Sequence, residues 1–461
     1  MFENEPEKRR LRDSTGFKML ALGGLVILLL IPLGMVRSLI SERAGRRAQA
    51  AGEVAATWGK SQLLGGPVLT VPYRQHATDD KGKEQIWISY ARFLPARLKV
   101  DGRVVPERRN RGIFEAVVYR ADLRWTGAFA RPSFAGWAIA PQDILWNDAY
   151  LSVGVPDLRG IRSSVGIDWE GRTLQFQPGG GEEGLWSSGL RVPVPGLEAG
   201  KETDFFGFAF DLGINGSKAL QFLPLGQQTV VDLHSTWPSP SFSGAFLPES
   251  RKVTGMGFDA HWNLSWFGRS YPQRWLREEA EKLAPQAALE GSAFGVELFL
   301  PVDAYQKTER SVKYGVLFLV LTFLTFFLYE VFSAVSLHPM QYFLVGSALC
   351  LFYLLLLSIS EHLPFGFSYL VASAATVLLI GGYSVAVLRG RLRALLMTLV
   401  LGVLYGYLFV LLQLEDYALL MGSLGLFVIL ALVMFLTRRI DWGSPRRSKS
   451  EGKFEGAVTP G

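Results

Sequence analysis

The chain has 461 residues, of which only 19% are charged, and its mean hydropathy is positive at +0.21. These values are unusual for a soluble protein, and the apolar residues gather near the start and in the last third, as in membrane proteins. The single cysteine, Cys350, excludes a disulfide framework within one chain. The net charge of +6 lies mostly at the two ends, so nucleic-acid binding has no electrostatic support in the nearly neutral middle.

The first apolar run covers 19–36 and follows a basic N-terminal segment, 1–18. It fits either a signal peptide or an anchor. The Ala-x-Ala site at 48–50 lies too far downstream for cleavage, and four arginines intervene. We therefore expect an uncleaved transmembrane helix with its N-terminus in the cytoplasm, continuing as a helix through 37–59.

Residues 37–310 contain no long apolar run and have the texture of a β-rich domain. Short segments rich in Val, Thr and aromatic residues, bounded by Gly, Pro, Asp or Asn, predict an all-β, sandwich-like domain. These segments are 66–73, 113–125, 149–155 and 229–237. A short helix is expected around 273–284.

A weak internal repeat links 100–129 to 214–246. Both stretches read as turn, strand, strand and then Gly-Ala-Phe. One interpretation is a duplication that gives two related β units, and the other is a chance match between β-sheet sequences.

The last third predicts a bundle of five transmembrane helices within 315–436, followed by a basic cytoplasmic tail, 437–461. The expected spans are 315–335, 342–359, 367–388, 394–413 and 418–436. The loop 389–393 and the tail are basic, whereas the loops after the second and fourth of these spans contain no Lys or Arg. The positive-inside rule then places both termini in the cytoplasm and 37–310 in the periplasm. The predicted fold class is an α+β membrane protein.

No motif for a nucleophile, a phosphate-binding loop or a metal site is present, and the five histidines lack metal-ligand spacing. We therefore expect no cofactor, no metal and no catalytic residues. The polar residues of the membrane section are the candidates for function, because charge at membrane depth is costly. Glu361, His362, Glu415 and Asp416 are expected on the outer face. They could bind a cation, relay a proton or contact the large domain, or else be ordinary hairpin residues among headgroups.

Glu330 and the following His338 are the inner-face candidates, with a glutamate that reaches water as the alternative for Glu330. Gly402 and Gly406 form a GxxxG pattern that predicts close helix packing within the bundle, with dimerisation as the alternative. Eleven of the twelve tryptophans lie in 37–310. We expect most of them to fill the β core, and the loop 235–246 to present an aromatic side chain outward.

Several strings resemble the CreD family of bacterial inner-membrane proteins. They include "LYEVFSAVSLHPMQYF" (328–343), "SISEH" (358–362) and "LLQLEDYALL" (411–420) in the membrane section, and "WGKSQLLGGPVLTVPY" (58–73) and "WPSPSFSGAFLP" (237–248) in the β domain. The resemblance covers roughly 35–442. It implies a cell-envelope integrity protein of Gram-negative bacteria, in a regulon run by a two-component sensor of the CreBC type. It also implies links to envelope stress and to colicin and β-lactam susceptibility.

The resemblance implies no catalytic residue, cofactor or ligand. The leading hypothesis is a non-enzymatic membrane protein in contact with membrane lipids, whose periplasmic domain contacts an envelope glycan, a lipid or a protein partner. One rival is a proton- or ion-coupled transporter that uses the outer-face acids. A second is an enzyme that modifies envelope lipid or glycan. The oligomeric state is open.

Overall fold

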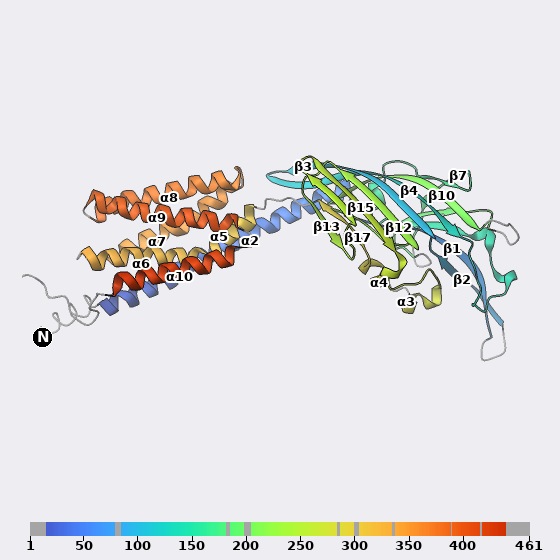
Figure 1. Ribbon diagram of the computed structural model, residues 1–461, viewed down its shortest axis with the longest axis horizontal. Coiled ribbons are helices and arrows are strands. Elements are labelled where there is room, and N and C mark those ends of the chain that lie inside the picture. The colour runs from blue at the N-terminus through green and yellow to red at the C-terminus, as the bar shows by residue number, and fades with distance from the viewer. Residues whose placement is uncertain are drawn as a thin grey trace, which may run out of the picture. The chain divides into compact units, whose positions relative to one another are not determined.

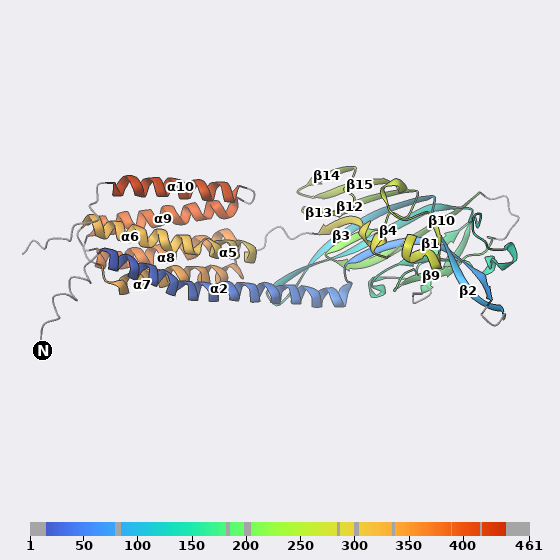
Figure 2. The same ribbon diagram turned by 90° about the horizontal axis from the view of Figure 1, so that it is seen from below.

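The computed structural model describes residues 15–78, 84–180, 185–197, 204–283, 286–298, 304–333, 337–388, 390–414 and 417–438. The chain divides into a helical unit, Met1–Gly45 with Asp303–Gly461, and a β unit, Arg46–Val302. Figures 1 and 2 show the elements of each unit.

The helical unit has a helix at each of the predicted spans. Its helices are α2 (Thr15–Trp58, which continues into the β unit), α5 (Ala304–Lys313), α6 (Gly315–Ser333), α7 (Pro339–Ser360), α8 (Phe365–Val387), α9 (Arg391–Gln413) and α10 (Ala418–Thr437). All except α5 are long and apolar enough to cross a membrane, which makes six among the described residues. The amphipathic helix α5 lies in the range predicted as β-rich and belongs to the helical unit.

Small residues do bring these helices together, but not at Gly402 and Gly406. Gly381 of α8, one of the small residues expected to pack in this span, lies against Thr398 of α9, where a methyl group would be 2.6 Å from the Thr398 hydroxyl. A methyl group on Gly346 would lie 2.2 Å from Leu29, so this glycine lets α2 approach α7. The prediction of intrachain packing at Gly402 and Gly406 is wrong, because a methyl group at either position would have no described atom within 4 Å.

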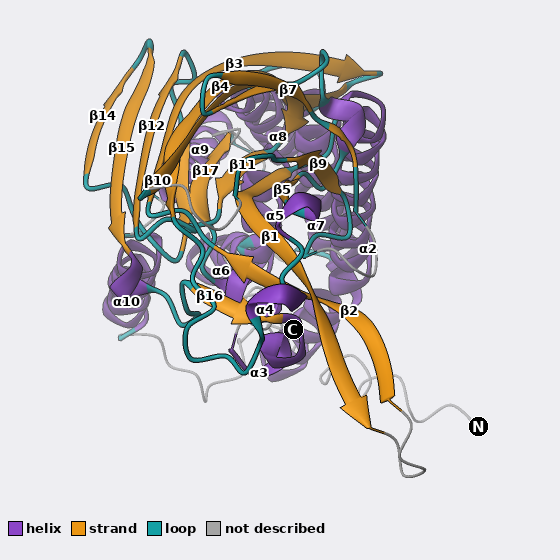
Figure 3. Cartoon of the chain, turned by 90° about the vertical axis from the view of Figure 1, so that its right-hand side faces the viewer, coloured by secondary structure: helices purple, strands orange, loops and turns teal. Residues whose placement is uncertain are grey.

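The β unit consists of a nine-stranded and an eight-stranded sheet, which confirms the predicted all-β domain. The first has the order β13-β17-β11-β1-β5-β9-β8, with β2 on β1 and β16 on β2, and the second has the order β14-β15-β12-β3-β4-β10-β6-β7. The strands of the first are β1 (Gln62–Thr78), β2 (Glu84–Phe93), β5 (Tyr150–Gly154), β8 (Gln177–Pro178), β9 (Gly189–Pro193), β11 (Ala219–Phe222), β13 (Pro240–Gly244), β16 (Arg274–Leu276) and β17 (Phe294–Leu298). Those of the second are β3 (Arg97–Arg111), β4 (Phe114–Ala130), β6 (Gly166–Trp169), β7 (Arg172–Gln175), β10 (Phe205–Ser217), β12 (Gln228–Ser235), β14 (Ser250–Thr254) and β15 (Gly257–Ser265). Figure 3 shows the second sheet curving through β12, β3 and β4.

Large rings fill the core of the β unit, as expected for a domain without disulfides. Trp125, Trp169, Trp262 and Trp275 are at most 1% exposed. The Trp169 ring stacks on that of Phe206 with 5.8 Å between centroids. Alternation of apolar and polar residues along β3, β4, β10 and β12 directs one side of the second sheet into this core and the other side to solvent.

The structure decides one open alternative and corrects two expectations. The stretch 100–129 forms the antiparallel pair β3–β4, whereas 214–246 alternates between the two sheets through β10, β11, β12 and β13, so the pairing favours a chance match over a duplication. The predicted helix at 273–284 begins only at α3 (Ala280–Leu283), because Arg274–Leu276 pairs with β2 as a strand. In the described stretch 235–246, Trp237 is buried and both Phe242 and Phe246 pack against the core, so the expected outward aromatic side chain is absent.

Candidate functional site

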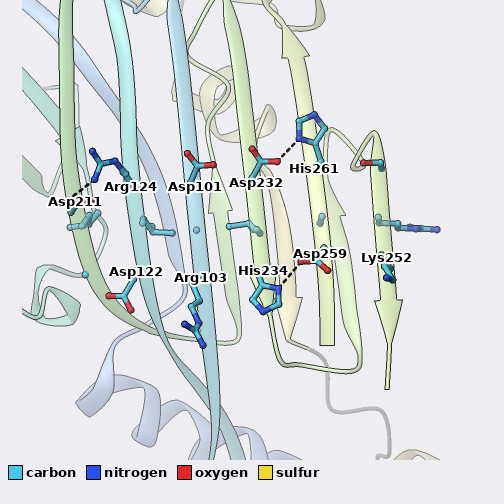
Figure 4. A pocket seen from close by; sticks show the side chains of 18 residues that line it. Asp101, Arg103, Asp122, Arg124, Asp211, Asp232, His234, Lys252, Asp259 and His261 are labelled. Carbon is cyan, nitrogen blue, oxygen red and sulfur yellow. Dashed lines mark hydrogen bonds and ion pairs between the residues drawn. The ribbon is translucent and has the colours of Figure 1, made fainter. Parts of the chain in front are cut away.

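Two rows of polar side chains cross the solvent side of the eight-stranded sheet. Strand register places one residue from each of six neighbouring strands in each row. The first row runs from β14 to β10 through Ser250, His261, Asp232, Asp101, Arg124 and Asp211. The second, two residues along each strand, runs through Lys252, Asp259, His234, Arg103, Asp122 and Gly213. We call these two rows the charged sheet face (Figure 4).

Two histidines of this face are paired reciprocally with two aspartates. His234 on β12 places Nδ1 2.7 Å from Asp259 Oδ1 on β15, and His261 on β15 places Nδ1 2.6 Å from Asp232 Oδ1 on β12. Figure 4 shows the two pairs side by side along the same pair of strands. A carboxylate at Nδ1 fixes the orientation of the ring and leaves Nε2 available for a further hydrogen bond.

Other carboxylates of the charged sheet face form ion pairs with lysine and arginine side chains. Lys99 Nζ lies 2.8 Å from Asp101 Oδ1 and 3.7 Å from Asp232 Oδ2. The hydrogen bond with Asp101 is the main cause of a raised Lys99 pKa. Arg162 pairs with Asp122 and occupies the space above Gly213, where a methyl group would lie 2.8 Å from its guanidinium.

The rows line a shallow hollow of about 840 Å³. Its charged side chains are exposed, so each pair contributes only about 0–1 kcal/mol to stability. Among the described residues, the side chains of Arg103 and Lys252 have no hydrogen bond or ion pair. No group of His, Cys, Asp and Glu that could hold a metal was found in that part of the chain. The arrangement is suited to binding a polar ligand through several hydrogen bonds and charges.

Comparison with known proteins identifies the family. The family model described as "Inner membrane protein CreD" matches residues 14–443. The chain is 36% identical over 438 residues to the inner membrane protein CreD of Escherichia coli (strain K12), covering 94% of each chain. The chain belongs to the CreD family. That description names a membrane protein and no reaction.

Solved structures add little to this CreD-family assignment. A point mutant of an M1 zinc metallopeptidase from Deinococcus radiodurans gives a TM-score of 0.19 at 11% identity, covering 37% of this chain and 38% of that one. A further structure of an M1 zinc metallopeptidase from the same organism gives a TM-score of 0.18 at 7% identity, with the same coverage. These values carry no argument about fold or activity.

In this CreD-family chain, Glu361 is held by other residues of the helical unit. Its Oε1 lies 3.7 Å from Arg43 of α2 and accepts a hydrogen bond of 3.1 Å from the Tyr305 hydroxyl of α5. His362 is exposed. Glu415 and Asp416 lie outside the described residues, so the predicted outer cluster is only half described.

The helix α5 contacts residues at the ends of both α7 and α9. Beside its Tyr305 contact with Glu361, its Lys307 Nζ lies 3.4 Å from Gln413 Oε1, and Arg310 donates to the Leu414 carbonyl at 2.9 Å. The loops after α7 and α9 therefore share one structural partner, as their predicted placement on one side of the bundle requires.

The two inner-face candidates do not meet in a site. Glu330 is 3% exposed, pairs with Lys18 Nζ at 2.6 Å and accepts a hydrogen bond of 3.0 Å from the Tyr342 hydroxyl. The alternative of a glutamate reaching water is therefore wrong. His338 is the N-cap of α7, where its Nδ1 accepts from the Met340 backbone N–H at 3.2 Å.

The charged sheet face was not predicted from sequence. Its residues come from six strands between positions 101 and 261, and each strand alone reads as an ordinary half-exposed strand. The reciprocal pattern of His and Asp on two paired strands, 232 and 234 against 259 and 261, is the one signal that could have revealed it.

Proposed function

We propose that this CreD-family chain is a non-enzymatic inner-membrane protein that maintains cell-envelope integrity, with its charged sheet face in the periplasm as the binding surface for an envelope component. Both termini lie in the cytoplasm. The basic loop at 389–393, compared with outer loops that lack Lys and Arg, supports this orientation.

The distribution of charge on the charged sheet face carries the proposal. The first row contains three carboxylates against one arginine, and the second contains two carboxylates against Arg103 and Lys252. A ligand that carries both cationic and anionic groups matches the two rows better than a uniformly charged polymer does. An envelope glycan that bears peptides has this chemistry.

Binding to purified peptidoglycan sacculi tests the proposal. The full chain in detergent should sediment with sacculi, and the double variant Arg103→Ala/Lys252→Ala should bind about tenfold more weakly, because two unpaired cations are lost. The matched control is Arg74→Ala/Arg172→Ala, which removes the same charge from exposed positions outside the hollow. Equal binding by both double variants would refute the assignment of the face.

Labelling of introduced cysteines tests the orientation. Cys350 is the only cysteine and is buried, so a Cys350→Ala background is nearly silent. In intact cells with a permeable outer membrane, an impermeant maleimide should label Lys252→Cys and spare Lys449→Cys. The opposite pattern would invert the proposed topology.

The contacts of Glu361 support a structural role for this residue. Arg43 and Tyr305 already neutralise and bind its carboxylate, so Glu361→Gln should retain complementation of the envelope phenotype in a deletion strain. Loss of complementation by a stably folded Glu361→Gln chain would instead favour ion-coupled transport.

A further inference from the structure

A long apolar crevice lies within the helical unit, between α6 and α9 on one side and α10 on the other. Its volume is about 840 Å³. It extends along α9 from Arg393 to Tyr407, which at 1.5 Å per residue corresponds to about 21 Å. The hydrocarbon core of a bilayer is about 30 Å thick, so an acyl chain in one leaflet spans about half of that and the crevice is long enough to hold it.

Apolar side chains on both walls of the crevice stay exposed. Val403 of α9 is 65% exposed and Leu432 of α10 is 55% exposed, although both line the crevice. At one end, the Tyr407 hydroxyl donates to the Met421 carbonyl, and a methyl group on Gly425 would lie 2.0 Å from that hydroxyl. The helix α10 is thus held against α9 at this end, while the lining side chains of both helices stay exposed beyond it.

The crevice has one charged side chain among the residues that line it, the exposed Arg393 at the opposite end. The hydroxyls of Thr325 and Tyr407 donate to backbone carbonyls. Arg393 makes one long contact, 3.4 Å to the Tyr329 hydroxyl, and no described carboxylate pairs with it. By contrast, Lys18, Arg37 and Arg43 of the same unit each pair with a glutamate.

We propose that the crevice holds one phospholipid with an anionic headgroup, one of whose acyl chains lies between α9 and α10 and whose phosphate is bound by Arg393. An acyl chain fills the apolar space that the walls leave open. The guanidinium donates charge-assisted hydrogen bonds to a phosphate at the end where a headgroup would lie. This inference does not depend on the function proposed for the β unit.

Lipid retention by the full chain tests the headgroup contact. The protein is reconstituted in nanodiscs of phosphatidylglycerol and phosphatidylethanolamine in equal parts, extracted into detergent, and its bound lipid is measured by native mass spectrometry. Arg393→Gln should retain about tenfold less phosphatidylglycerol. The control Arg391→Gln removes an arginine of the same helix that does not line the crevice and should retain wild-type amounts. Equal retention by both variants would overturn the phosphate assignment.

A second matched pair tests the acyl-chain position. Val403→Trp fills the crevice, whereas Leu395→Trp adds the same ring to a 65% exposed position on α9 outside it. Only Val403→Trp should displace bound lipid. In a Cys350→Ala background, Val403→Cys and Val428→Cys should stay reduced under mild oxidation while lipid is bound. A rapid disulfide within the chain would show that the crevice closes on itself, and one between chains that a second copy fills it; either result would overturn the proposal.

Discussion

Replacing Lys18 by methionine should destabilise the helical unit by about 3 kcal/mol. Lys18 Nζ lies 2.6 Å from Glu330 Oε1, and the carboxylate is only 4% exposed. At this separation and an effective dielectric constant of about 20, the attraction is about 6 kcal/mol. Desolvation of the two groups offsets roughly half of it, and removal of one partner from a buried pair typically costs about 3–5 kcal/mol. The Tyr342 hydroxyl still donates to the remaining carboxylate, but it brings no positive charge.

The double variant Lys18→Met/Glu330→Gln isolates the pair. It should recover most of the lost stability, because a neutral amide accepts the Tyr342 hydrogen bond without requiring a cation. Helical circular dichroism during SDS-induced unfolding is the assay, since eleven of the twelve tryptophans lie in 37–310 and fluorescence therefore reports mainly on the β unit. Lys307→Met, at an exposed contact with Gln413, is the control. If the double variant were no more stable than Lys18→Met, the ion-pair reasoning would be refuted.

Two further predictions concern the β unit. Trp262→Ala should lower the free energy of unfolding of the β unit by about 3–5 kcal/mol, because this ring is fully buried. Trp266→Ala, at a 38% exposed position, should lower it much less. Denaturant titration followed by tryptophan fluorescence compares the two variants. Hydrogen bonds from the imidazole to Glu84, the larger effect, and to Asp143 raise the pKa of His76 above 6.5. The contribution of His76 to the stability of the fold is therefore complete below pH 6.5 and is lost as the pH rises through the higher pKa of the folded state. NMR titration should show this pKa falling in Glu84→Gln/Asp143→Asn, and an unchanged value would contradict the assignment.

The membrane spans could be predicted because long apolar runs have few other physical outcomes. The ends of α8 and α9 fall within three residues of the predicted positions. The helix α5 escaped prediction because its buried side is partly polar: Thr308 and Ser311 are fully buried beside Tyr305 and Val312. A hydropathy pattern does not distinguish such a helix from a solvated loop.

Sites assembled across strands depend on register, which the sequence does not state. Asp232 lies opposite His261 because of the antiparallel β12–β15 register. Asp101 lies beside Asp232 because of the parallel β3–β12 register. The GxxxG pattern at Gly402 and Gly406 was misleading for the opposite reason: small residues permit close approach without requiring it, and here the facing space is open.

The separation of Lys18 and Glu330 along the chain, 312 residues, has a consequence for biosynthesis. At about 5–20 residues per second, a ribosome needs roughly 15–60 s to make the intervening polypeptide. For that interval the first transmembrane helix lies in the bilayer without the glutamate that will neutralise its lysine. The whole β unit is synthesised during the same interval. It can therefore form its core before the remaining five spans are inserted.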